Sequence, residues 1–187
     1  RTMPTRVKIC GITSAADALA AVDAGVDALG FMFYPASKRY VIPDVVAAFL
    51  GDLPPFVMKV GVFVDAPEED VRRIARACDL DALQFHGAET PAYCEQFGPT
   101  PVIKAFRMAD QGSLTALPSF AVSAWLLDSH VAGELGGTGE RFNWDLAVQA
   151  RSLGRPIILA GGLTPENVAE AVRQVTPYAV DVSSGVE

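Results

Sequence analysis

The chain has 187 residues, 50% of them hydrophobic and 20% charged, which suits one well-packed domain over residues 1–187 and argues against disorder. A net charge of −7 and a pI near 4.8 exclude a nucleic-acid surface of clustered Lys and Arg, but not a small anion held by backbone amides. No membrane-spanning run and no secretory signal are present, and the three cysteines lack metal-type spacing, so we expect a cytoplasmic protein with free thiols.

Eight short apolar runs rich in β-forming residues follow one another along the chain, and each predicts a strand. They lie at residues 6–11, 28–33, 59–64, 82–87, 102–107, 124–129, 156–162 and 179–185. Successive runs start roughly 20–30 residues apart, which is the spacing of a unit made of one strand and one helix.

Helical patterns lie between these runs. Segment 14–25 has apolar residues at helical spacing, a capping Ser14 and a stop at Gly25. Three further helical patterns lie at residues 66–79, 90–98 and 164–175, the last two beginning with Thr-Pro. Segment 113–120 is the weakest predicted helix because Pro118 interrupts it.

Eight strands alternating with seven helical segments predict an α/β fold, the (β/α)8 TIM barrel. An open doubly wound sheet is the alternative, but eight regular units without a dinucleotide-binding fingerprint favour the closed barrel. The sequence stops at Glu187, directly after the eighth predicted strand, so the barrel lacks its final helix. We therefore expect the natural chain to continue beyond this residue.

Polar residues end four of the predicted strands. Alternate residues of a strand point to the same side, and the active site of such a barrel lies at the carboxyl ends of its strands. The polar residues that share the inward side are Lys8, Cys10, Gln84, His86, Asp128, Asp181 and Ser183. Polar loop boundaries occur in any barrel, but agreement among four strands favours a site. Cys10 is either a small apolar filler or a base or nucleophile at the barrel mouth.

Glycine and serine follow the seventh and eighth strands. Gly161 and Gly162 precede one helical pattern, and Ser183, Ser184 and Gly185 end the last strand. Glycines let a backbone approach a ligand closely, and amides and hydroxyls donate hydrogen bonds to phosphate. Turns need glycine in any case, but both loops occupy the usual phosphate site of these barrels. The two loops together predict a phosphate pocket.

Two other loops carry residues suited to ligand contact. The loop after the sixth strand contains Gly136 and Gly137, and it is either a flexible connector or a loop that contacts the ligand. The loop after the second strand carries Lys38 and Arg39. These form either a solvated basic turn or a cationic site for a substrate carboxylate, which suits an arginine fork.

The remaining histidines and cysteines do not indicate a metal centre. His86 and His130 are the only histidines, and no matching carboxylate cluster accompanies them. We interpret His86 as a hydrogen-bonding wall residue. Cys78 and Cys94 lie in helical patterns, and we expect both to be structural.

A set of motifs along almost the whole chain resembles the phosphoribosylanthranilate isomerase family. In order they are KICGIT, GFMFYPASKRYV, VGVFVD, LQFHG, LLDS, GGTGERFNW, LAGGLTPENV and VDVSSGVE. Glycine loops alone fit any phosphate-binding barrel, whereas KICG combined with SKRY and GGTGERFNW is specific. The resemblance implies an Amadori rearrangement in tryptophan biosynthesis, which needs no cofactor. It implies a small phosphorylated substrate and no nucleic-acid or membrane partner, and we expect a monomer.

The resemblance also implies roles for individual residues. Cys10 matches the general base of the family, Asp128 the general acid, and Arg39 the residue that binds the anthranilate carboxylate. The phosphate-binding positions are Gly161, Gly162, Ser183, Ser184 and Gly185, and the other substrate-binding positions are Lys8, Gln84, His86, Gly136, Gly137 and Asp181. One departure is Asn143, where the pattern often has Asp.

The chemistry supports an acid and a base at these positions. An acid must protonate the ring oxygen of the furanosylamine, and a base must then remove the proton at C2′. Asp128 must therefore carry a proton at neutral pH, and Cys10 must be a thiolate with a lowered pKa. Lys8, two residues earlier on the same side of the strand, is the expected cause of that lowering.

Three rival functions fit the sequence less well. A histidine-pathway ribonucleotide isomerase usually pairs two aspartates, so its first strand is expected to end in Asp. A pentulose-phosphate epimerase needs metal-binding histidines that this chain lacks. A non-catalytic phosphate-binding barrel needs no acid and base, so assays of Cys10 and Asp128 variants distinguish it.

Overall fold

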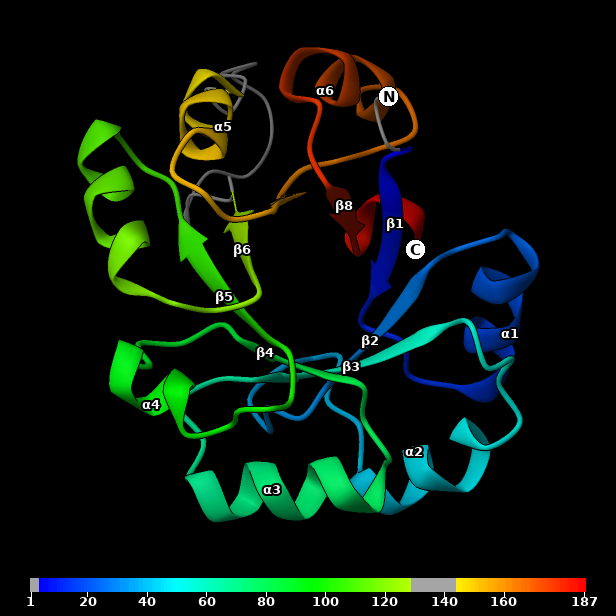
Figure 1. The fold of residues 1–187 in the computed structure, drawn as a ribbon. Coiled ribbons are helices and arrows are strands. Elements are labelled where there is room, and N and C mark those ends of the chain that lie inside the picture. The colour runs from blue at the N-terminus through cyan, green and yellow to red at the C-terminus, as the bar shows by residue number, and fades with distance from the viewer. Residues whose placement is uncertain (1–3, 129–143) are drawn as a thin grey trace.

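The computed structural model describes residues 4–128 and 144–187, and eight parallel strands in it form a closed barrel in sequence order (Figure 1). The predicted TIM barrel is therefore confirmed. The strands are β1 (Arg6–Cys10), β2 (Ala28–Met32), β3 (Met58–Phe63), β4 (Ala82–Phe85), β5 (Val102–Arg107), β6 (Ala124–Asp128), β7 (Ile157–Ala160) and β8 (Ala179–Val182). Strands β1 and β8 close the ring, with Lys8 in register with Asp181.

The helices lie around the outside of the barrel (Figure 1). They are α1 (Ala15–Asp23), α2 (Pro43–Leu50), α3 (Glu68–Ala77), α4 (Pro91–Glu95), the 3₁₀ helix η1 (Gln111–Ser119), α5 (Trp144–Arg151), α6 (Val168–Val175) and the 3₁₀ turn η2 (Ser184–Val186). Ser14 caps α1 as predicted, since its hydroxyl accepts a hydrogen bond from the Asp17 amide at 3.1 Å. The weak segment around Pro118 is a 3₁₀ helix rather than an α-helix.

Helix α6 begins four residues later than the sequence predicts. Residues 164–167 form a turn instead, in which the Thr164 amide donates to Oδ1 of Asn167 at 2.9 Å. The side-chain amide of Asn167 also donates to the Gly162 carbonyl at 2.8 Å. These two bonds satisfy backbone groups of the loop after β7, so the chain completes this turn before it enters the helix.

The core has two layers, divided by the barrel wall. Outward side chains of the strands pack against the helices in the larger cluster, which contains Phe31, Phe63, Phe85 and Trp125. A smaller cluster of alternate residues from β2 to β8 fills the interior: Ala28, Val60, Ala82, Ile103, Ala105, Ala124, Leu126, Ile158, Ala160 and Ala179. Strand β1 contributes no apolar residue to this inner cluster, because its inward positions are Lys8 and Cys10.

A groove of about 810 Å³ runs along the outside of β1 and α1. Outward Val7 and Ile9 of β1 and Ala20, Ala24 and Val26 at α1 line it. After β8, the described chain contains only the turn η2, which lies near β1 in Figure 1. The apolar outer surface of β1 is thus only partly covered by helix.

Candidate active site

A cavity of about 280 Å³ lies at the carboxyl ends of the strands. The polar residues predicted to point inward from different strands meet there, because parallel strands all end at the same mouth. The predicted site residues that line it are Cys10, Arg39, Gln84, His86, Asp128, Gly161, Gly162, Asp181, Ser183, Ser184 and Gly185. Lys8 lies just beneath them and contacts Asp181. The predicted side of each strand was therefore right.

Strand β1 brings a thiol and an ammonium together inside the barrel. Nζ of Lys8 donates a 2.7 Å hydrogen bond to Oδ1 of Asp181, and both side chains are buried. Gly30 of the neighbouring strand leaves room for this group. A Cβ atom at position 30 would lie 2.7 Å from Sγ of Cys10 and 3.0 Å from Nζ of Lys8. Gly30 was not among the site residues predicted from the sequence, although a glycine inside a predicted strand indicates close approach by another group.

The pKa of Cys10 is raised, which contradicts the lowered value expected from the sequence. Burial of the thiol is the largest cause, and the carboxylate of Asp181 adds to it. Lys8 acts in the predicted direction, lowering the pKa of Cys10, but burial outweighs it. Burial also acts to lower the pKa of Lys8, but Asp181 and Cys10 outweigh this, so the pKa of Lys8 is raised. The pair is therefore a thiol beside an ammonium at neutral pH.

The other two cysteines lie among apolar side chains, as expected of structural residues. Cys78 and Cys94 are 1% and 2% exposed and belong to the core between barrel and helices. Burial raises the pKa of Cys94 to about 11, so this thiol stays protonated at neutral pH. All three cysteines are free.

A chain of hydrogen bonds joins β4 to β6 across the cavity. Nε2 of Gln84 lies 3.3 Å from Nδ1 of His86, and Nε2 of His86 lies 3.2 Å from Oδ2 of Asp128. Gln84 is 1% exposed, and its Oε1 has no hydrogen-bond partner among the described residues. An unpaired buried acceptor costs about 1–3 kcal/mol. The sequence placed these three residues on the inward side but could not show that they form one chain.

The loops after β7 and β8 meet beside the cavity. Gly161, Gly162, Ser183 and Ser184 line one part of it. A side chain at position 185 would collide with the carbonyl oxygen of Leu163, so a glycine lets the two loops touch. The geometry is suited to a phosphate held by backbone amides and serine hydroxyls.

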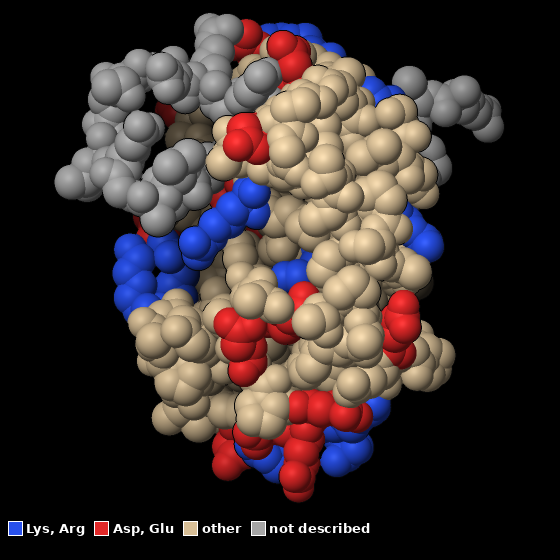
Figure 2. Space-filling model, turned by 90° about the vertical axis from the view of Figure 1, so that its left-hand side faces the viewer, with Lys and Arg blue, Asp and Glu red and all other residues tan. Residues whose placement is uncertain are grey.

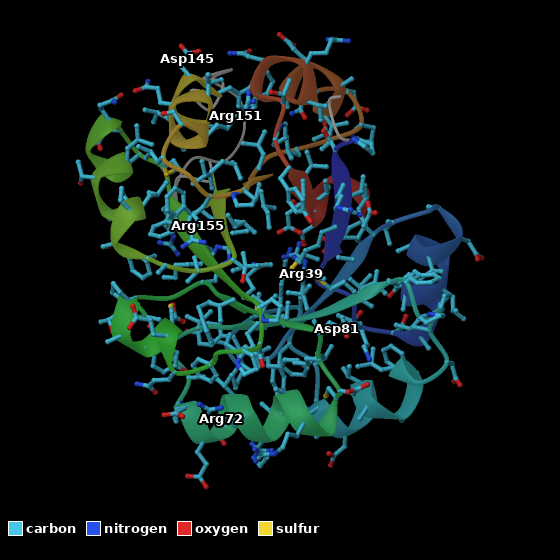
Figure 3. The ribbon with its side chains drawn as sticks, viewed as in Figure 1. Arg39, Arg72, Asp81, Asp145, Arg151 and Arg155 are labelled. Atoms are coloured by element: carbon cyan, nitrogen blue, oxygen red, sulfur yellow. The ribbon has the colours of Figure 1, made fainter. Side chains whose placement is uncertain are left out.

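Arg39 reaches the cavity from the loop after β2. Figure 3 places its label at the centre of the molecule beside β1 and β8, whereas Arg72 lies on the outer helix α3. Nε of Arg39 donates to Oε1 of Glu187, and this hydrogen bond raises the pKa of Arg39 and lowers that of Glu187. Arg39 is thus a cation at the rim of the cavity.

A buried ion pair outside the barrel wall supports the loop that carries His86. Nζ of Lys104 donates to Oε2 of Glu89 at 2.9 Å, to the Gly87 carbonyl at 2.7 Å and to the Phe85 carbonyl at 3.3 Å. The carboxylate of Glu89 also accepts hydrogen bonds from the amides of Asp65 and Gly87. This pair was not predicted from the sequence, although a lysine inside the apolar run 102–107 was a signal.

Some residues singled out in the sequence lie outside the part of the chain that the structure describes. Gly136, Gly137, His130 and Asn143 lie outside the described residues. Within residues 4–128 and 144–187, no group of three or more His, Cys, Asp or Glu could hold a metal ion, and no helix is long and apolar enough to cross a membrane. Figure 2 shows a group of basic side chains on the left of the face that it presents, and acidic side chains mainly at its centre and lower end.

Comparison with known proteins gives one consistent family. Residues 7–187 match the family model described as N-(5'phosphoribosyl)anthranilate (PRA) isomerase. The N-(5'-phosphoribosyl)anthranilate isomerase of Geobacter sp. strain M21 is 57% identical over 183 residues, which cover 98% of this chain and 89% of the relative. The enzyme of the same name from Citrifermentans bemidjiense is 56% identical over 183 residues, covering 98% of this chain and 88% of the relative.

Solved structures agree. The phosphoribosylanthranilate isomerase of Thermotoga maritima superposes with a TM-score of 0.92 at 43% identity, covering 98% of this chain and 90% of the other. A phosphoribosylanthranilate isomerase in complex with reduced 1-(o-carboxyphenylamino)-1-deoxyribulose 5-phosphate has a TM-score of 0.89 at 41% identity, with coverage of 98% and 89%. Another solved structure is of mutually generated monomers of the dimeric enzyme from Thermotoga maritima.

Proposed function

The chain belongs to the N-(5'-phosphoribosyl)anthranilate isomerase family, and on this premise we propose that Cys10 and Asp128 are the base and acid of its reaction. The enzyme converts phosphoribosylanthranilate to 1-(o-carboxyphenylamino)-1-deoxyribulose 5-phosphate in tryptophan biosynthesis. The observation that carries the residue assignment is the cavity in which the thiol of β1 and the carboxyl group of β6 both lie.

The acid acts first. Asp128 donates its proton to the furanose ring oxygen, and the bond between this oxygen and C1′ breaks as the nitrogen lone pair forms a C1′=N bond. The ring opens to a protonated Schiff base with a hydroxyl at the former ring oxygen. Asp128 is left as a carboxylate, which accepts a hydrogen bond from His86 when Nε2 carries the hydrogen.

The base acts second. The thiolate of Cys10 removes the proton from C2′, and the electron pair of that C–H bond forms a C1′=C2′ bond while the C=N electrons return to nitrogen. The resulting enolamine tautomerises to the ketone. Because burial raises the pKa of Cys10, only a minor fraction of thiolate forms at neutral pH, and Lys8 stabilises that fraction.

The two ends of the substrate have separate anchors in this proposal. The loops after β7 and β8 bind the phosphate through backbone amides and serine hydroxyls, and Arg39 binds the anthranilate carboxylate. Gln84, His86, Lys8 and Asp181 lie between these anchors and shape the site around the sugar. Gly136 and Gly137, predicted to contact the substrate, keep that role as a proposal.

Activity of two variants tests the acid and base. Cys10→Ala and Asp128→Asn should each lower kcat by about 10²–10⁴-fold with little change in substrate affinity, since a proton-transfer group acts mainly in the transition state. Fluorescence-monitored turnover of phosphoribosylanthranilate gives kcat and KM. Cys94→Ala, a buried thiol far from this chemistry, is the matched control and should retain kcat. Near-normal turnover by Cys10→Ala would make this thiol a packing residue.

The anthranilate end has its own test. Arg39→Ala should weaken the binding of product analogues that carry the carboxylate. The loss in binding free energy should be about 1.5–3 kcal/mol, because a charged hydrogen bond is lost. Analogues without the carboxylate should bind nearly as before, as measured by calorimetric titration. Equal losses for both analogues would assign the carboxylate to another residue.

Two expectations on the state of the protein stay proposals. We propose a monomer, although a relative is dimeric, and sedimentation velocity would decide between them. We also propose that the enzyme acts in the cytoplasm, which the three free thiols support.

A further inference from the structure

We propose that Gln84 is a positioning residue of the isomerase reaction: it holds the imidazole of His86 in the tautomer whose hydrogen is on Nε2 and directs that N–H at Asp128. This inference rests on the proposed role of Asp128 as the acid. It assigns to Gln84 an action through two other side chains rather than direct contact with the substrate.

The geometry of the chain sets the tautomer. The side-chain amide nitrogen of Gln84 can only donate, and it faces Nδ1 of His86 at 3.3 Å. Nδ1 must then be the acceptor, so the single hydrogen of the neutral ring is on Nε2. That nitrogen lies 3.2 Å from Oδ2 of Asp128 and donates to it. The hydrogen bond from Gln84 therefore determines which nitrogen of His86 donates to Asp128.

Only one end of the Gln84 amide has a hydrogen-bond partner among the described residues. Gln84 is almost fully buried, its Oε1 has no partner among the described residues, and its strand neighbours in register are Val62 and Ile103. An apolar side chain of similar length would fill the same space without an unpaired acceptor. The amide therefore lowers stability at this position, and the only described side-chain bond it makes is the one to His86.

The held tautomer matters when Asp128 gives up its proton. The N–H of His86 then stabilises the carboxylate that forms and keeps the group in one orientation. With the hydrogen on Nδ1 instead, the lone pair of Nε2 would face that carboxylate and disfavour proton donation. Gln84 thus favours the tautomer in which His86 assists the acid.

Two variants separate tautomer control from packing. Gln84→Met keeps the length of the side chain and removes the donor. Gln84→Glu is nearly isosteric, and its ionised carboxylate offers only acceptors, which places a hydrogen on Nδ1. Leu126→Met, inside the same barrel layer and fully buried, is the matched packing control. The readouts are kcat and KM, the melting temperature, and the ¹⁵N shifts of the imidazole nitrogens. The chain has two histidines, so a His130→Asn background assigns the signals of His86.

In the wild type, we expect a protonated Nε2 and an unprotonated Nδ1 on His86. Gln84→Met should mix the tautomers, lower kcat about 10- to 100-fold with KM within about threefold, and melt no lower than the wild type. Gln84→Glu should show hydrogen on Nδ1 and also lose kcat, while Leu126→Met keeps it. A hydrogen on Nδ1 in the wild type, or unchanged kcat in Gln84→Met, overturns the inference. Full activity of Asp128→Asn would instead overturn the proposed role of Asp128 as the acid, whatever the spectra show.

Discussion

Two lysines are buried to the same extent in this barrel, but their surroundings differ. The side chains of Lys8 and Asp181 are 4% and 9% exposed, and those of Lys104 and Glu89 are 4% and 2% exposed. Lys104 has three acceptors for its three N–H donors, two of them backbone carbonyls. Lys8 has one carboxylate acceptor and faces the thiol of Cys10. All three N–H donors of Lys104 are therefore bonded to groups that hold the fold together. Lys8 also has a donor that can face the reactive thiol.

Position relative to the barrel wall explains the difference. Lys104 points outward from β5 into the packed layer, where Glu89 and the carbonyls of Phe85 and Gly87 surround it. Lys8 points inward, beneath a cavity lined by Asp181 and Cys10. A buried ion pair is therefore not evidence of function by itself. The pair of Lys8 differs from that of Lys104 because a thiol at the cavity lies beside the ammonium.

Breaking the ion pair of Lys104 and Glu89, outside the barrel wall, should have the largest effect on stability. Lys104→Met leaves the carboxylate of Glu89 buried without a counterion and removes the donor to two carbonyls, so we expect a loss of about 3–5 kcal/mol in the free energy of unfolding. Urea denaturation measures it. The double variant Lys104→Met/Glu89→Leu should recover much of that loss. A denaturation midpoint unchanged in the single variant would show that the pair does not stabilise the fold.

Breaking the ion pair of Lys8 and Asp181, inside the barrel, should change activity. In Lys8→Met the cation that lowers the pKa of Cys10 is gone, so the pKa rises further and the thiolate fraction at neutral pH falls. We expect kcat/KM at pH 7 to fall, because less of the enzyme carries the base in its active form. The deficit should shrink as pH rises, because the rate increases with the thiolate.

The pH dependence of kcat/KM tests the direction in which each variant changes the pKa of Cys10. The acidic limb of the wild-type profile should lie above the ordinary range of a thiol, and Lys8→Met should move it to still higher pH. Asp181→Asn removes a group that raises the pKa of Cys10, so its limb should move to lower pH. Shifts in the same direction for both variants would disconnect the pair from the base.

An ion pair with one fully exposed partner should show the smallest effect. Nζ of Lys59 lies 3.0 Å from Oδ2 of Asp79, whose side chain is 98% exposed. Lys59→Met should cost about 0–1 kcal/mol by urea denaturation and leave kcat unchanged, since solvent screens the interaction. A loss as large as that of Lys104→Met would mean that pairing, rather than burial, sets the cost.

The sequence predicted those parts of the site that follow from strand geometry. Alternation along a strand fixes which side each residue faces, so the convergence of Cys10, Gln84, His86 and Asp128 could be predicted without distances. The barrel followed from eight regular units, and the glycine loops followed from their position after the last two strands.

Interactions between strands far apart in sequence could not be predicted in this way. The bond from His86 to Asp128 crosses the barrel, and its length depends on how eight strands close. The raised pKa of Cys10 results from burial outweighing a neighbouring cation, and a sequence lists the cation but not the burial. The start of α6 was wrong because the hydrogen bonds of Asn167 compete with the helix.

Gly30 bears on how a mutational scan of this enzyme should be read. Its position contributes no titratable group, yet any side chain there would press on both the sulfur of Cys10 and the ammonium of Lys8. A saturation library would therefore score position 30 as inactivating as strongly as a position that transfers a proton. Only a second screen for folded protein, combined with thiol reactivity toward a small alkylating agent, would separate the two kinds of position. A substitution at Gly30 would change the reactivity of the Cys10 thiol, although glycine itself has no reactive side chain.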